Sequence, residues 1–225
     1  IRLGDLLSME SGLEFNEDYG DVTDVTRMLY LEPDMAGFSL AKPALAQTGE
    51  KFNYSSGTSV LLSRIWMSRF GGPDEALAYP RLALFAPLGM TSAVMEADAA
   101  GTFVGSSYVY ATARDWARFG LFLADDGVWK GERLLPEGFV AQMQMPTAAS
   151  GSQYTQLQAW QVGPGGEADE TFGLSPETYW LLGHDGQSVA ILPSERLVVV
   201  RLGLTPSKLG YRPQALVKAV SDALK

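Results

Sequence analysis

The spacing of hydrophobic residues changes along this chain. Up to about residue 140, apolar residues recur at the three- and four-residue spacing of amphipathic helices. The clearest stripe is formed by Leu61, Leu62, Ile65 and Trp66, and Gly71-Gly72 ends it. The pattern predicts helices over residues 1–9, after Asp21, over 58–70, over 73–85 and over 116–124.

Two features of the first part are less regular. The short helix after Asp21 is expected to bury Val22, Val25 and Leu29 on one side. Between this helix and Tyr54 the residues are polar, which predicts an ordered loop that covers a cleft. Four turn-forming residues mark this loop: Pro33, Gly37, Pro43 and Gly49.

From about Gln153 the apolar runs are short and rich in β-branched and aromatic residues, which is typical of strands. Antiparallel strands are predicted over 157–162, 179–184, 188–192 and 197–202, with a hairpin turn at 193–196. A last amphipathic helix begins at Pro213 and is expected to bury Leu216, Val217, Val220 and Leu224. The pattern predicts an α+β fold, with a mainly helical region over 1–150 and an antiparallel sheet with a C-terminal helix over 151–225.

Composition narrows the class of partner. The 225 residues carry a net charge of -9, which argues against nucleic acid and anionic membranes and favours a small molecule. No apolar run reaches the roughly 18 to 20 residues that a membrane span needs. With no cysteine and one histidine, we expect no metal and no cofactor. The residues do not distinguish a periplasmic or secreted protein from a cytoplasmic one.

The only histidine lies in Gly183-His184-Asp185-Gly186-Gln187, between two apolar runs. A titratable side chain followed by glycine at a strand end can present a proton-handling group and an open backbone edge to a substrate. The alternative is that His184 is only a turn or edge residue. Asp185 has the same two interpretations, because it can orient a substrate or serve the turn.

A second group of polar residues precedes the predicted helix at 58. The segment Tyr54-Ser55-Ser56-Gly57 joins a phenol, two hydroxyls and a glycine. Ser56 either caps the helix or belongs to a site. Several aromatic residues could line an acyl pocket or simply fill the core: Phe103, Tyr154, Trp160, Phe172 and Trp180.

The segment at Tyr54-Ser55-Ser56 and the segment at His184-Asp185-Gly186 together resemble motifs of the serine β-lactamase and penicillin-binding-protein superfamily. The resemblance is to class C β-lactamase-like enzymes, which include D,D-peptidases, family VIII esterases and 6-aminohexanoate-oligomer hydrolases of bacterial type. Further segments resemble this family in the same order: residues 6–13, 85–90, 110–120 and 183–187. The resemblance spans nearly the whole chain and implies a β-lactamase-like fold and a serine hydrolase.

The family's first motif is Ser-x-x-Lys at the start of a helix, where the serine attacks a carbonyl carbon. The family places it upstream of the segment at 6–13, and we expect this chain to lack it, together with the N-terminal strands. A literal Ser39-Leu40-Ala41-Lys42 is present. We reject it because Pro43 disfavours helical geometry there, so serine and lysine should not share one helical turn.

The resemblance also implies roles. Tyr54 would be the catalytic general base and later the acid, but without a neighbouring lysine it should be a neutral phenol. Ser56 stands where many relatives bind substrate through asparagine, which favours esters or simple amides over penicillins. His184 replaces the lysine of Lys-Thr-Gly and would contact substrate, and Gly186 would let the strand edge approach it. The backbone N–H of Gln187 would be one oxyanion donor.

We therefore interpret the chain as the C-terminal portion of an ester or amide hydrolase, truncated and inactive alone because the nucleophile is absent. The alternative is a non-catalytic ligand-binding or interaction module of the same fold. In the family the N-terminal strands pair with the C-terminal sheet, so their loss would leave an open edge. We expect a separate chain carrying the missing segment to fill this edge, or self-association of the chain.

Overall fold

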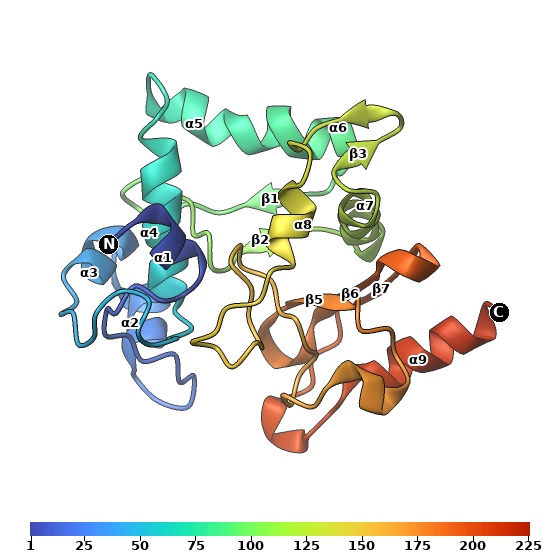
Figure 1. The fold of residues 1–225 in the computed structure, drawn as a ribbon. Helices are drawn as coiled ribbons and strands as arrows, with labels where there is room; N and C mark the ends of the chain where they lie inside the picture. The colour runs from blue at the N-terminus through green and yellow to red at the C-terminus, as the bar shows by residue number, and fades with distance from the viewer. The chain divides into compact units, whose positions relative to one another are not determined.

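The computed structural model describes residues 1–225 except for the side chain of Ser207. The chain divides into two compact units (Figure 1). Unit 1 comprises residues 1–85 and 93–110, and unit 2 comprises residues 86–92 and 111–225. The sequence-based division at residue 150, which separates a helical from a strand-rich region, stays a prediction. Among the residues described, no helix has the length and apolar character to cross a membrane.

Unit 1 is mainly helical. It contains α1 (Leu3–Leu7), α2 (Asp24–Leu31), α3 (Met35–Leu40), α4 (Ser56–Met67), α5 (Pro73–Pro80), the π-helical turn η1 (Arg81–Phe85), and the antiparallel strands β1 (Val94–Met95) and β2 (Val109–Tyr110). Helix α4 packs against α1 and α3, and it carries the apolar stripe that predicted it. The core buries residues from four helices and two loops: Leu6, Phe15, Val25, Met28, Leu29, Met35, Ala36, Val60, Leu61 and Val104.

Two predictions for unit 1 are wrong. The supposed loop before Tyr54 contains α3, which begins after the N-cap Asp34, whose side chain accepts a hydrogen bond from the Gly37 N–H at 2.8 Å. The helix buries Met35 and Ala36 in the core, so tertiary contacts stabilise a helix of only six residues that contains a glycine. Val22 precedes α2 and is 74% exposed, because the helix starts only after the N-cap Thr23.

The helix predicted over 73–85 is present, but its second half changes type. Pro80 lies at the end of α5 and has no N–H to donate to the preceding turn. The chain continues as the π-helical turn η1, a conformation that commonly accommodates such a break in the hydrogen-bond ladder.

Unit 2 contains helices and a three-stranded antiparallel sheet of order β5-β6-β7. Its helices and strands are α6 (Ala86–Leu88), α7 (Ala113–Ala124), β3 (Val128–Trp129), β4 (Glu132–Arg133), α8 (Phe139–Met143), β5 (Tyr179–Leu182), β6 (Ser188–Leu192), β7 (Leu197–Arg201) and α9 (Pro213–Ala223). Short 3₁₀ turns lie between them at η2 (Asp169–Phe172), η3 (His184–Gly186), η4 (Pro193–Glu195) and η5 (Ser207–Leu209).

The sheet of unit 2 is covered on both faces (Figure 1). On one face Gly120 of α7 lies against Val189 and Val198. On the other face Val217 of α9 packs in a cluster with Trp180. The central strand β6 is buried at every residue, which explains why the four residues after Ser188 are apolar without alternation. The α+β fold class predicted from the sequence is confirmed.

Two predictions for unit 2 need correction. Residues 157–162 do not form a strand, because Gln158 adopts a left-handed backbone (φ 60°). Within this range a single residue, Trp160, forms a bridge to β5, at Trp180. Helix α9 buries Val217, whereas Leu216 and Leu224 are 40% and 72% exposed. The buried stripe of α9 passes instead through Pro213, Gln214, Val217 and Ser221.

Candidate active site

The first half of the candidate site lies at the N-terminus of α4 in unit 1. Ser55 is the N-cap residue, and its hydroxyl accepts a hydrogen bond from the Thr58 N–H at 3.1 Å. The capping role considered for Ser56 therefore belongs to Ser55. Ser56 is the first residue of the helix, and Tyr54 precedes it by two positions.

Glu17 binds Ser56 at this helix start. Its Oε2 accepts a hydrogen bond from the Ser56 N–H at 2.8 Å, and the Ser56 hydroxyl bonds its Oε1 at 2.5 Å. Burial raises the pKa of the Glu17 carboxyl, and its bonds to Ser56 oppose this rise only in part. Ser56 is only 4% exposed. The substrate contact assigned to Ser56 stays a prediction, and it requires Glu17 to release the hydroxyl.

The environment of Tyr54 keeps its phenol neutral. Burial and then the charge of Glu17 raise the pKa of Tyr54 to about 12. This agrees with the expectation of a neutral phenol at Tyr54. Tyr19 belongs to the same group, because its hydroxyl bonds Glu17 Oε1 at 3.4 Å and its pKa is raised by burial and by Glu17.

The charge of Glu17 can be tested directly. Glu17→Gln is expected to lower the pKa of Tyr54 from about 12 and to leave it above 10, because burial is the larger cause. The measurement is an NMR titration of protein labelled at the tyrosine Cζ carbons, with Tyr54→Phe to assign the signal. Glu14→Gln is the matched control, because Glu14 is exposed nearby in the chain. An unchanged pKa of Tyr54 in Glu17→Gln would contradict the claim that the charge of Glu17 raises it.

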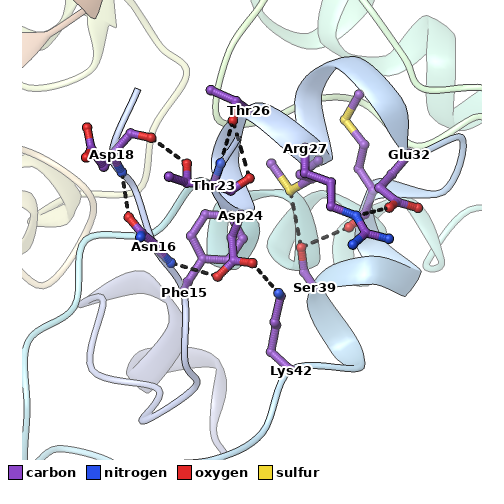
Figure 2. A network of polar contacts seen from close by, with 12 residues as sticks. Phe15, Asn16, Asp18, Thr23, Asp24, Thr26, Arg27, Glu32, Ser39 and Lys42 are labelled. Carbon is purple, nitrogen blue, oxygen red and sulfur yellow. Dashed lines mark hydrogen bonds and ion pairs between the residues drawn. The ribbon is translucent and has the colours of Figure 1, made fainter. Parts of the chain in front are cut away.

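The literal Ser39-x-x-Lys42 motif does not form a serine–lysine pair (Figure 2). Ser39 lies in α3, which ends at Leu40 before Pro43, so Lys42 lies outside the helix and the two residues do not share a helical turn, as predicted. The Ser39 hydroxyl donates to the Met35 carbonyl at 2.8 Å and is buried. The Lys42 ammonium bonds the Asp24 carboxylate. The two side chains have separate partners, which supports the rejection of this motif.

The second half of the candidate site lies in unit 2, in the turn between β5 and β6. His184, Asp185 and Gly186 form the 3₁₀ turn η3. The His184 side chain is 53% exposed, and its Nε2 lies 3.5 Å from Asp185 Oδ2. His184 and Asp185 therefore lie in a turn, as expected if they are only turn residues. The contacts of their side chains with substrate stay predictions.

The two following residues have contacts within the turn. Gly186 has a φ of 80°, and a Cβ at this position would lie 3.2 Å from both Arg201 Nη1 and the Thr205 carbonyl oxygen. Glycine is therefore required here by the backbone and by its neighbours. The Gln187 N–H donates to the His184 carbonyl over a long 3.4 Å. The roles of Gly186 and Gln187 toward substrate and oxyanion stay predictions.

Each unit gathers its own part of the predicted site. Unit 1 brings together Tyr54 and Ser56 and adds Glu17, whereas unit 2 holds residues 184–187 in one turn and adds Arg201. Glu17 and Arg201 could not be found from the sequence, because neither lies in a motif and each is far along the chain from the site residue that it contacts, Ser56 and Gly186. The core interpretation of the aromatic residues agrees with their burial, which is complete or partial for Phe103, Tyr154, Trp160, Phe172 and Trp180.

Several solved structures have a fold similar to that of this chain. A candidate 6-aminohexanoate-dimer hydrolase from Bacillus anthracis matches with a TM-score of 0.76 at 20% identity, over 98% of this chain and 60% of that one. A β-lactamase from Mycobacterium bovis and a candidate β-lactamase from Bacteroides dorei match with TM-scores of 0.64 and 0.69, each at 20% identity over 98% of this chain and 71% of theirs. This chain thus spans about three fifths of the length of the first of these structures.

The sequence of this chain matches a family model but no individual curated protein. A search of curated proteins finds no match to this chain. The family model described as Beta-lactamase matches residues 1–215. The chain belongs to the Beta-lactamase family.

Proposed function

We propose that this chain carries part of the active site of a serine hydrolase that cleaves an ester or amide through an acyl-enzyme. The observation that carries the proposal is the position of Tyr54, two residues before the first residue of α4, in a chain of this family. Within unit 2, a separate observation fits the proposal, because the turn at His184 presents a half-exposed imidazole beside a glycine.

The proposed chemistry divides between this chain and a segment outside residues 1–225. That segment supplies the serine, whose oxygen attacks the carbonyl carbon, and a lysine. Tyr54 transfers the serine proton to the leaving alcohol or amine as the ester or amide bond breaks. Because the pKa of Tyr54 is about 12 in its present surroundings, it needs such a nearby cation to act as a base. Residues 1–225 alone are therefore proposed to be inactive.

A partner strand belongs to this proposal. Strand β7 is an outer strand of the sheet in unit 2, and an outer strand offers unpaired N–H and C=O groups. The outer side of β5 is already bridged by Trp160 at Trp180. We propose that a strand of the serine-bearing segment, or of a second copy of the chain, pairs along the outer edge of β7.

A non-catalytic binding module is the second candidate. The raised pKa of Tyr54, about 12, favours it, because a neutral phenol does not act as a general base. A small-molecule ligand would then be bound without turnover.

Hydrolysis of a chromogenic ester and labelling by a fluorophosphonate distinguish the two candidates. We expect residues 1–225 to show neither, and the chain extended by any residues encoded before Ile1, or mixed with them, to show both. Tyr54→Phe in the active form should lower kcat by roughly 10²- to 10⁴-fold, whereas Tyr30→Phe, at a tyrosine that is 69% exposed, should not. Labelling of a serine within residues 1–225 would refute the claim that the nucleophile lies elsewhere, and an active form insensitive to Tyr54→Phe would refute its role.

A further inference from the structure

The turn that carries His184 is held by Arg201 at the end of β7 and by Thr205 in the segment that follows. Arg201 Nη1 donates a hydrogen bond to the Gly186 carbonyl at 2.8 Å. The Thr205 N–H donates to the Asp185 carbonyl at 2.7 Å. Two successive carbonyl groups of the turn are therefore bonded by one short segment.

The backbone of this turn needs such support. Asp185 and Gly186 are both left-handed, with φ angles of 51° and 80°. Aspartate tolerates this region better than most residues, but the conformation is still less favourable than the right-handed one. A backbone of this kind persists only where its surroundings fix it.

Arg201 is itself fixed in place. Besides Gly186, its guanidinium donates to the Gly203 carbonyl at 2.6 Å and to the Thr205 hydroxyl at 2.5 Å. Its Cζ lies 4.4 Å from the centre of the Tyr211 ring, which it covers. A planar guanidinium can make these bonds and the ring contact together, whereas a lysine ammonium lacks the fork of donors.

We propose that Arg201, assisted by Thr205, is the positioning residue that fixes the His184 turn and thereby the direction of the imidazole toward substrate. The contact of His184 with substrate rests on the proposed function, whereas the hold of Arg201 on the turn does not. Arg201 acts through the carbonyl of Gly186 and does not itself touch the reacting atoms.

The only histidine of the chain makes the proposal measurable, because its imidazole gives one assigned NMR signal without labelling ambiguity. In the unaltered chain we expect one narrow imidazole signal and backbone order parameters near 0.85 for residues 184–186. Arg201→Gln and Arg201→Lys should both broaden or split the imidazole signal and lower these order parameters to below about 0.6. Circular dichroism of the same samples shows whether each variant is folded.

Matched variants separate this role from a general loss of stability. Arg196→Gln alters an exposed arginine at the other end of β7, paired with Asp125 at 3.2 Å, and should leave the His184 signal unchanged. Thr205→Val should loosen the His184 turn less than Arg201→Gln does. Thr205→Ser should leave the turn as rigid as in the unaltered chain, because serine keeps the hydroxyl.

If an Arg201 variant does not fold, the comparison of Thr205→Val with Thr205→Ser still tests the proposal. A rigid turn in folded Arg201→Gln, or no difference between Thr205→Val and Thr205→Ser, overturns the proposal. The measurement uses no substrate, so its outcome is independent of whether the chain hydrolyses one.

Discussion

Replacing Asp169 with alanine is expected to lower the free energy of unfolding by about 3 to 5 kcal/mol. Asp169 is 3% exposed, and its Oδ2 accepts a hydrogen bond from the Trp180 indole N–H at 2.6 Å. Its Oδ1 accepts a second from the Gly163 N–H at 3.1 Å. The substitution leaves both buried donors without this partner, and each such loss costs about 1 to 3 kcal/mol.

Urea unfolding followed by tryptophan fluorescence measures this effect. Glu170→Ala is the matched control, because Glu170 is the next residue in the same turn and is exposed. It should change the free energy by less than about 0.5 kcal/mol. If Asp169→Ala were as stable as this control, the Asp169–Trp180 bond would have no part in holding β5.

The pH dependence of stability gives Asp169 a second signature. Burial raises the pKa of Asp169 above its ordinary value of 3.8, so the folded state binds the proton more tightly than the unfolded state. The contribution of Asp169 therefore falls as pH rises from about 3.8 through the raised pKa. Asp169→Asn removes this titration and keeps one acceptor for Trp180, so its stability should vary less with pH over that window.

Gly57→Val is expected to destabilise unit 1 by about 3 kcal/mol, at the upper end of the usual range for overpacking. A Cβ at Gly57 would lie 2.6 Å from Cε2 of the Phe15 ring and 2.8 Å from Ser39 Oγ. Both neighbours are buried, so neither can move away without disturbing the core. Helix α4 can approach Phe15 this closely only because residue 57 has no side chain.

The same substitution at a second helical glycine provides the control. A Cβ at Gly4 of α1 would meet nothing within 4 Å, and valine has a slightly higher helix propensity than glycine. Gly4→Val should therefore leave stability unchanged or raise it by a few tenths of a kcal/mol. Equal effects of the two substitutions in urea unfolding would show that helix propensity, and not the contact with Phe15, decides the cost at Gly57.

The elements that the sequence predicts well are those whose signals are local. Helix α7 (Ala113–Ala124) includes the helix predicted over 116–124 and begins three residues earlier, after the N-cap Thr112, whose hydroxyl accepts from the Asp115 N–H at 3.3 Å. Strand β6 is an apolar run between two turns and needs no distant information. Helix α3 has Gly37 within it and prolines on both sides, so its local signal is that of a loop. Only burial of Met35 and Ala36 against the core makes it helical.

By itself, the sequence determined the fold class, the family resemblance and the segments where Tyr54 and His184 lie, because each depends on residues close together in the chain. The tertiary structure decided what surrounds them. Glu17 reaches Ser56 across 39 residues, and Arg201 reaches Gly186 across 15. Such pairings have no local pattern, because the two partners meet only when the elements that carry them pack. The raised pKa of Tyr54 follows from its burial and from Glu17, and the geometry of the His184 turn follows from Arg201 and Thr205. Only the folded chain reveals these surroundings.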